Sequence, residues 1–276
     1  MKIADGKTLA AKLRAELKEK IEKKAFKPTL VVVIVGDNPA SQIYVRNKIK
    51  ACEEVGIRSL SYALPAEISQ KELEGFLDGL ARDETVHGIL LQLPLPQGLN
   101  AESAMARIPV EKDVDGFSAE HLGLLALHKE KIVAATPSGV MKILEHEGVD
   151  LKGKHAVVLG RSDTVGKPMA MLLLNADATV TVCHSKTENL KEICQSADIL
   201  VSAIGKAKFV TADMIKEQAV VIDVGINRDE SGKLCGDVDF ENVKEKASLI
   251  TPVPGGVGPM TIAMLLYNTY TAAFKE

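Results

Sequence analysis

The feature that most constrains this chain is an alternation of strand-like and helix-like segments, which occurs twice along its 276 residues. The first run predicts three apolar strands, at 29–35, 59–64 and 86–93. The second run predicts four strands, at 154–159, 179–183, 199–203 and 220–224. Strands separated by helices pair in parallel through right-handed crossovers, so the expected fold class is α/β with two domains.

Apolar periodicity and capping residues locate the helices between these strands. Leucine or isoleucine recurs every four residues from Leu9 to Ile21, which predicts a helix over 8–24 with one apolar stripe. Ser69 and Glu72 form a capping box, which indicates the start of another helix. Between them, another helix is predicted through Glu54, ending at Gly56.

The later part of the chain is less regular. A short helix is predicted over 214–218, and an apolar helix over 260–274 follows a loop rich in proline and glycine. The region 111–150 separates the two alternations, and we place the domain boundary there. The apolar helix must pack on something, but periodicity alone does not identify its partner.

Composition excludes several classes of protein. The chain has 34 basic and 37 acidic residues and no tryptophan, which disfavours binding to nucleic acid. No apolar run approaches the roughly 20 residues of a membrane helix. The cysteines lack the clustering of a disulfide framework or zinc site, so we expect no metal and a reducing, cytoplasmic setting; they stand at 52, 183, 194 and 235.

A glycine-bearing turn follows the first strand of the second domain. Gly160 and Gly166 enclose Arg161 and Ser162, in the order strand, turn, helix that a Rossmann unit uses to bind a pyrophosphate. The spacing differs from the usual G-x-G-x-x-G, so an ordinary turn between a strand and a helix is an alternative.

The next strand bears on the choice of dinucleotide. NAD-binding folds usually end this strand with a carboxylate, but here the strand over 179–183 is followed by His184, Ser185 and Lys186. A hydroxyl and an ammonium there, together with Arg161, suit a 2′-phosphate, so NADP is favoured. Lys186 could equally be a solvent-exposed loop charge.

Polar residues of the first domain point to a second site. Tyr44 and Lys48 share one helix face, and Gln92 ends the third strand among apolar residues. A lysine above the carboxyl ends of parallel strands can be desolvated and transfer protons. The alternatives are an ordinary surface lysine, a satisfied core glutamine and, for Asp113 and Asp115, turn capping.

Together these segments resemble the bifunctional methylenetetrahydrofolate dehydrogenase/methenyltetrahydrofolate cyclohydrolase family. The resemblance spans nearly the whole chain, in order and at similar spacing, and its last segment is especially specific. The matching segments are 44–48 (YVRNK), 91–96 (LQLPLP), 112–117 (KDVDGF), 160–162 (GRS), 165–169 (VGKPM), 183–187 (CHSKT) and 252–261 (PVPGGVGPMT).

The resemblance implies a chemistry and a role for each matching residue. The family oxidises 5,10-methylenetetrahydrofolate with NADP and hydrolyses the methenyl product to 10-formyltetrahydrofolate, within one-carbon metabolism that serves purine, methionine and histidine biosynthesis. Lys48 would transfer protons, Gln92 would hold Lys48, Tyr44 would orient the folate and Asp115 would bind the pterin. The other expected folate contacts are Leu91, Leu93, Pro254, Gly255, Gly256, Val257 and Gly258, and the expected NADP contacts are Gly160, Arg161, Ser162, Ser185 and Ile226.

The resemblance also implies the domain organisation and the partners. Residues 1–120 and 255–276 would form the folate-binding catalytic domain, with the last helix packing back on it, and 136–254 the Rossmann-type NADP-binding domain. A homodimer and no nucleic-acid or membrane partner are expected. The alternatives are a dehydrogenase without cyclohydrolase activity, which the presence of both Lys48 and Gln92 disfavours, and an NADP-binding regulatory protein with an inactive first domain.

Overall fold

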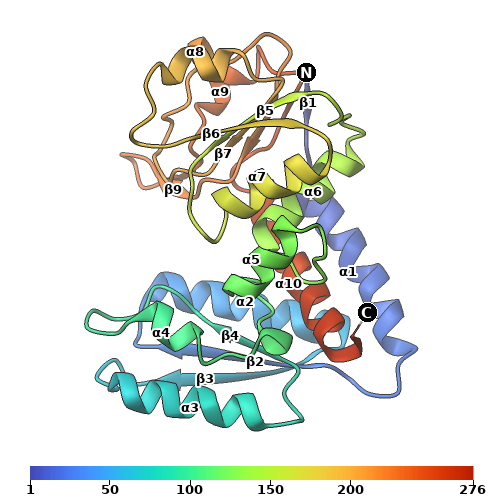
Figure 1. The fold of residues 1–276 in the computed structure, drawn as a ribbon, viewed down its shortest axis with the longest axis vertical. Helices are drawn as coiled ribbons and strands as arrows, with labels where there is room; N and C mark the ends of the chain where they lie inside the picture. The colour runs from blue at the N-terminus through green and yellow to red at the C-terminus, as the bar shows by residue number, and fades with distance from the viewer. Residues whose placement is uncertain (276) are drawn as a thin grey trace. The chain divides into compact units, whose positions relative to one another are not determined.

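A computed structural model describes residues 1–275, with the backbone alone for 39–41 and 43 (Figure 1). The described chain divides into two compact units, each built on a parallel sheet. The six-stranded unit contains Met1–Ala11, Leu125–His128 and Ala134–Met264, and the three-stranded unit contains Lys12–Leu124, Lys129–Val133 and the segment from Leu265 onward.

The sheet of the three-stranded unit follows the predicted pattern. Its strands are β2 (Thr29–Val35), β3 (Arg58–Leu64) and β4 (Gly88–Leu91), which pair in parallel in the order β3-β2-β4. All seven residues of β2 are buried, because this central strand is covered on both faces. β4 ends two residues before the predicted limit of 93.

Alternate residues of β2 pack against helices on opposite faces of this sheet. Val31 and Val33 share a buried cluster with Leu73 and Leu77 of α3 (Gln70–Arg82). The other helices of this unit include α2 (Pro39–Val55), α4 (Ala101–Met105) and α5 (Ala119–Ala126), and Figure 1 shows α2 and α3 on opposite faces. The predicted capping box at the start of α3 is confirmed.

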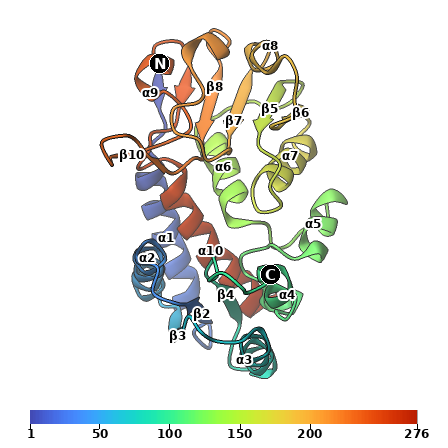
Figure 2. The ribbon, with the colours of Figure 1, turned by 90° about the vertical axis from the view of Figure 1, so that its left-hand side faces the viewer.

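The last helix, α10 (Val257–Phe274), packs in the three-stranded unit beside α1 (Gly6–Glu22), as Figure 2 also shows. Tyr267 donates a hydrogen bond to the Leu13 carbonyl at 3.3 Å, and the Asn268 amide donates to the Val114 carbonyl at 2.9 Å. The predicted return of this helix to the first domain is therefore confirmed.

The six-stranded sheet has the order β1-β11-β8-β7-β5-β6, and all its strands are parallel. β5 lies between β6 and β7, so the chain leaves β5 toward one side and later continues on the other. This reversal is the switch point at which doubly wound sheets bind ligands. The strands are β1 (Lys2–Ile3), β5 (His155–Leu159), β6 (Thr179–Cys183), β7 (Ile199–Ser202), β8 (Val220–Asp223) and β11 (Leu249–Ile250). Figure 2 shows β8, β7, β5 and β6 side by side.

The remaining elements include segments that the sequence pattern did not predict. The helix expected over 214–218 is wrong: only a 3₁₀ turn, Ala212–Met214, forms there, and Gln218 has a left-handed backbone with φ of 63°. α10 starts at Val257, three residues before the predicted limit of 260. Its first turn tolerates Pro259, because the backbone N–H that proline lacks would have no partner within the helix at that position. The other elements are α6 (Ala135–His146), α7 (Gly166–Asn175), α8 (Leu190–Gln195), α9 (Phe240–Val243), the 3₁₀ turn Val110–Lys112 and the hairpin of β9 (Asn227–Arg228) and β10 (Leu234–Cys235).

Candidate functional site

The glycine turn lies at the carboxyl ends of three strands of the six-stranded sheet. Gly160 follows β5, and its N–H donates to the Cys183 carbonyl at the end of β6 at 2.9 Å. A Cβ on Gly160 would lie 2.3 Å from the Ala203 carbonyl oxygen beyond β7, and its φ is 114°. Only glycine therefore allows the turn to sit at the switch point between these strands.

The start of α7 faces this turn. The Ser162 hydroxyl accepts the N–H groups of Val165 at 3.2 Å and Gly166 at 3.3 Å, so it binds the backbone at the start of α7, whose N-cap is Val165. Arg161 and Ser162 are exposed, and a Cβ on Gly166 would lie 2.3 Å from the Gly160 carbonyl oxygen. This tight, exposed helix start has the donors and the dipole that suit a phosphate group.

The residues expected at the other strand ends are also accessible. Ser185 and Lys186 are exposed in the turn after β6, where the Lys186 N–H donates to His184 Nδ1 at 3.2 Å. Ile226, just beyond β8, is a large apolar side chain that is 50% exposed. Because β5, β6 and β8 are parallel, all these residues lie at one edge of the sheet.

The proline- and glycine-rich loop follows β11 at this same edge. Its Gly255 has φ of 106° and accepts a hydrogen bond from the Lys7 N–H at 2.9 Å. A Cβ on Gly6 would lie 1.9 Å from the Gly256 carbonyl oxygen, so the start of α1 packs directly on the loop. Pro254 is exposed and Gly258 is partly exposed, whereas the Val257 side chain is buried as the first residue of α10.

In the three-stranded unit, Lys48 of α2 and Gln92 after β4 are in contact. The Lys48 ammonium donates to Gln92 Oε1 at 3.1 Å. Gln92 Nε2 donates to the Leu93 carbonyl at 2.7 Å, which leaves Oε1 facing the lysine. The Gln92 N–H also donates to the Val33 carbonyl, so the sheet itself positions this side chain.

Three further residues predicted to contact the folate lie near Lys48 or Gln92 in the sequence. Tyr44 lies one helical turn before Lys48 and is 40% exposed, and partial burial raises the pKa of its hydroxyl. Leu93 is partly exposed, whereas the Leu91 side chain is only 4% exposed and packs in the core beneath α3. Any contact of Leu91 with a ligand would therefore involve its backbone.

The two aspartates near residue 114 have different environments. Asp113 is buried, and its carboxylate accepts the N–H groups of Gly116 at 3.1 Å and Ser118 at 2.8 Å. Asp113 therefore caps the turn, which is the alternative to a binding role given for it in the sequence analysis. Within the described chain, no hydrogen bond engages the Asp115 carboxylate, which is partly buried.

Lys48 and Asp115 influence each other electrostatically. Burial lowers the pKa of Lys48, and the Asp115 charge partly offsets that effect. Burial raises the pKa of Asp115 to about 6; the Lys48 charge opposes this rise, and Asp113 adds to it. A desolvated amine, an oriented amide and a perturbed carboxyl together provide groups for acid–base chemistry.

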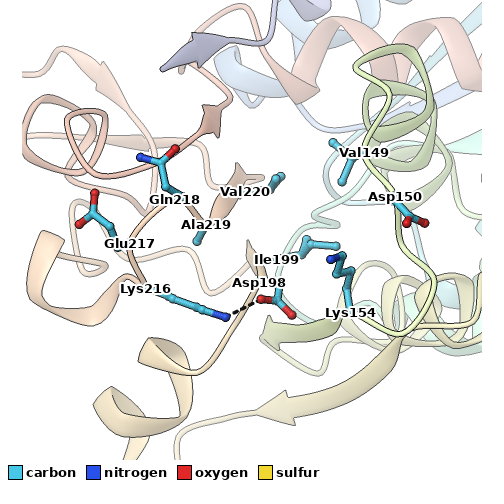
Figure 3. Close-up of a pocket in the computed structure, with 10 residues that line it drawn as sticks. All are labelled: Val149, Asp150, Lys154, Asp198, Ile199, Lys216, Glu217, Gln218, Ala219 and Val220. Carbon is cyan, nitrogen blue, oxygen red and sulfur yellow. Dashed lines mark hydrogen bonds and ion pairs between the residues drawn. The ribbon is translucent and has the colours of Figure 1, made fainter.

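A pocket of 270 Å³ lies at the opposite edge of the six-stranded sheet. Its lining includes Asp198, Ile199 and Val220, at the amino ends of β7 and β8. Figure 3 shows Lys216 directed at Asp198, with which it forms an ion pair at 2.6 Å. This pocket is separate from the carboxyl edge on which the glycine turn lies.

No group of three or more His, Cys, Asp or Glu side chains that could hold a metal ion occurs in residues 1–275. The thiols of Cys52 and Cys194 are buried, which raises the pKa of each to about 12. Neither thiol is therefore a ready nucleophile.

Sequence reasoning missed two buried carboxylates at the carboxyl edge of the six-stranded sheet. Asp237 is 0% exposed and Asp223 is 3% exposed, and both accept hydrogen bonds from neighbouring loops. The available signal was Asp223, an aspartate inside the predicted strand over 220–224, together with glycines at 225 and 236 that lie beside the two carboxylates.

Comparisons with known proteins agree with this arrangement. Residues 4–115 match the family described as tetrahydrofolate dehydrogenase/cyclohydrolase, catalytic domain, and 134–276 match its NAD(P)-binding domain. The bifunctional protein FolD of Campylobacter curvus is 56% identical over 276 residues, which cover 99% of this chain and 96% of that relative.

Solved structures extend the match to the fold. The bifunctional FolD of Campylobacter jejuni superimposes with a TM-score of 0.97 and 52% identity, covering 100% of this chain and 99% of the other. The Trypanosoma brucei enzyme, solved with NADP cofactor and inhibitor, gives a TM-score of 0.94 and 41% identity over 99% and 97% of the two chains. On these grounds, the chain belongs to the tetrahydrofolate dehydrogenase/cyclohydrolase family.

Proposed function

We propose that this protein oxidises 5,10-methylenetetrahydrofolate to the 5,10-methenyl cation with NADP and hydrolyses that cation to 10-formyltetrahydrofolate. The observation that carries this function is the hydrogen-bonded pair of Lys48 and Gln92 with Asp115 electrostatically coupled to it. This pair occurs in a chain that matches both domains of the family.

The division of labour between the domains is part of the proposal. Residues 1–120 and 255–276 form the folate-binding catalytic domain, and 136–254 form the NADP-binding domain. The two compact units support a division near these limits, although Met1–Ala11 and the start of α10 group with the six-stranded unit.

Lys48 transfers the proton in the hydrolytic step. Hydrolysis requires removal of a proton from the attacking water and delivery of one to the departing ring nitrogen. A lysine whose pKa is lowered by burial can be neutral often enough to take the first proton. Gln92 holds the amine in place through its Oε1, and Tyr44, on the same helix face, orients the folate.

Asp115 binds the pterin ring of the folate. A carboxylate can accept two parallel hydrogen bonds from the ring N–H and exocyclic amino group. Its freedom from hydrogen bonds within the described chain leaves it available for this contact, unlike Asp113. Leu93, the Leu91 backbone and the 254–258 loop supply the remaining folate contacts.

Gly160, Arg161, Ser162, Ser185 and Ile226 hold the dinucleotide. The close packing of Gly160 and Gly166, where no Cβ would fit, brings the start of α7 within reach of a phosphate. Arg161 and Ser185 suit the 2′-phosphate, and the exposed Ile226 offers an apolar surface to a ring. When bound, NADP accepts the hydride.

One assay tests the function and separates it from its alternatives. Purified protein is mixed with methylenetetrahydrofolate and NADP, and the absorbances of NADPH and methenyl-folate are followed together. We expect NADPH to accumulate while the methenyl signal is consumed. Persistence of the methenyl signal at its uncatalysed rate of decay would indicate a dehydrogenase alone, and no NADPH would indicate a regulatory protein.

The cellular setting and assembly are proposals of the same kind. A homodimer is expected from the family resemblance, and sedimentation of the purified protein tests it. A cytoplasmic location agrees with four cysteines that are all free and buried. No helix in residues 1–275 is long and apolar enough to cross a membrane.

A further inference from the structure

We propose that Asp237 is a positioning residue that shapes the dinucleotide site by fixing the backbone of 203–206 and the turn that carries Ile226. This inference rests on the proposed function, since it concerns the same NADP site. Asp237 lies after β10, more than 70 residues beyond the glycine turn, and is not among the residues expected to touch the dinucleotide.

The Asp237 carboxylate accepts hydrogen bonds from three consecutive backbone N–H groups beyond β7. Oδ2 accepts those of Ile204 at 2.7 Å and Gly205 at 3.3 Å, and Oδ1 accepts that of Lys206 at 2.9 Å. The segment from Gly205 to Phe209 is exposed to solvent. Its path at the edge of the sheet therefore depends on this buried anchor.

Side-chain donors complete the environment of the same carboxylate. The Ser202 hydroxyl donates to Oδ2 at 3.2 Å, and Asn227 Nδ2 donates to Oδ1 at 2.9 Å. Asn227 follows Ile226, so Asp237 ties the turn beyond β8 to the segment beyond β7. One carboxylate thus joins two of the strand ends that face the proposed dinucleotide.

Asp223 secures the other side of Ile226. Its carboxylate accepts the N–H groups of Gly225 at 3.0 Å, Asp237 at 2.9 Å and Val238 at 2.9 Å. Ile226 is therefore held on both sides, because Gly225 before it bonds to Asp223 and Asn227 after it bonds to Asp237. An apolar side chain that is 50% exposed keeps a fixed direction only if its backbone is fixed in this way.

The packing of glycines shows how closely the carboxylates approach the turns. A Cβ on Gly225 would lie 2.2 Å from Asp237 Oδ1, and a Cβ on Gly236 would lie 1.8 Å from Asp223 Oδ2. On the other side, the Ala203 carbonyl oxygen lies 2.3 Å from the position that a Cβ of Gly160 would take. Displacement of 203–206 would therefore also disturb the glycine turn.

The test uses Asp237→Asn in the full-length protein. The amide keeps the size of the carboxylate but turns one acceptor oxygen into a donor, which must face backbone N–H groups. We expect the KM for NADP to rise about tenfold or more. Hydrolysis of methenyltetrahydrofolate without dinucleotide should stay within about twofold of wild type, which a globally misfolded protein would not show.

Asp229→Asn is the matched control. Asp229 lies in the same β9–β10 hairpin and accepts the N–H groups of Ser231 and Lys233, each at 3.0 Å, at the hairpin's tip. It therefore also shapes a turn and bonds to none of the backbone N–H groups of 204–206; its ion pair with Lys208, at 3.5 Å, reaches only the side chain of that residue. We expect its KM for NADP to match that of wild type.

Hydrogen exchange gives a direct readout of positioning. In Asp237→Asn the amides of Ile204 and Lys206 should exchange about tenfold faster or more, while that of Val201 within β7 stays protected. If the wild type reduces NADP and Asp237→Asn has the same KM for NADP, the inference is overturned. A wild type that does not reduce NADP at all would instead overturn the proposed function.

Asn227→Ala keeps the inference testable if Asp237→Asn fails to fold. Asn227 is partly exposed, and its loss removes only one bond to Asp237. We expect a rise of about threefold or more in the KM for NADP with unchanged hydrolysis. A KM for NADP that stays at the wild-type value in this variant would also overturn the inference.

Discussion

At the scale of single residues, the loss of Lys48 should impair hydrolysis of the methenyl cation selectively, without impairing NADP binding. Lys48→Met keeps the length of the side chain and removes the proton donor and acceptor. Hydrolysis of the methenyl cation should fall by about 10²–10⁴, because positioned acid–base groups contribute that much. Decay of the methenyl absorbance measures this rate, and NADP binding should persist.

Lys50 provides the matched control for that change. It is an exposed lysine on the same helix, two residues further on, and faces away from Lys48. Lys50→Met should hydrolyse the cation at the wild-type rate. Hydrolysis by Lys48→Met within twofold of wild type would show that another group transfers the proton.

Asp115 should make folate binding depend on pH. Its pKa of about 6 in the free protein means that the carboxylate is ionised at pH 7 and becomes protonated below pH 6. The KM for the folate should therefore rise as pH falls through 6, and Asp115→Asn should raise this KM and flatten the profile. An equal rise in the KM for NADP would instead indicate a structural turn.

Arg161 should determine the preference for NADP over NAD. A charged hydrogen bond to a 2′-phosphate contributes about 1.5–3 kcal/mol, so Arg161→Ala should raise the KM for NADP about tenfold or more. The KM for NAD, which lacks that phosphate, should barely change, and added salt should weaken the preference. Lys152→Ala, an exposed site just before the amino end of β5, is the control. Equal losses with both dinucleotides would assign Arg161 to the shared pyrophosphate.

At the scale of elements, α3 shows how one distant side chain completes a helix. Lys112 Nζ donates to the carbonyls of Ala81 at 2.8 Å and Asp83 at 2.7 Å, at the carboxyl end of α3, where a cation is favoured. Lys112→Met should lower the free energy of unfolding by about 2 kcal/mol. Urea denaturation measures it, and Lys71→Met, exposed at the other end of α3, should cost little.

The regular elements could be predicted because local pattern determines them. The apolar run of β2, the capping box of α3 and the strand ending at Cys183 all follow from residues within a few positions. The two-residue strands β1 and β11 could not be predicted, because each exists only through pairing with a distant strand. The expected helix over 214–218 failed for a related reason, since tertiary packing places Gln218 in a left-handed conformation.

The candidate sites divide in the same way. The contact between Lys48 and Gln92 joins a helix face and a strand end that a parallel sheet brings together. Sequence pattern placed each residue near this edge, and the family resemblance predicted their contact. The bonds of the Asp223 and Asp237 network between different loops span 10 to 35 residues of sequence. Nothing in the local sequence indicates which backbone N–H groups a buried carboxylate will meet.

At the scale of the whole molecule, buried carboxyls should govern how stability varies with pH. Burial raises the pKa of Asp115 and of Asp223 to about 6 each, and these two carboxyls lie in different units of the described chain. Between about pH 4 and 6 the folded chain therefore holds protons that the unfolded chain has released. Stability from these groups is fully present at low pH and is lost as pH rises through 6.

The resulting prediction concerns the slope of unfolding free energy against pH. Each carboxyl can contribute at most about 1.4 kcal/mol per pH unit, so the wild type should lose stability between pH 4.5 and 6.5 relative to Asp115→Asn and Asp223→Asn. His87, whose pKa is lowered by burial, has the opposite sign but is common to all three proteins and cancels in the comparison. Exposed carboxyls with lowered pKa values, such as Asp213 at about 2, are likewise common to all three proteins and cancel in the comparison. Urea denaturation at four pH values measures the slopes. Parallel curves for wild type and Asp223→Asn would show that this carboxyl titrates normally, and that its three N–H donors offset the cost of burying its charge.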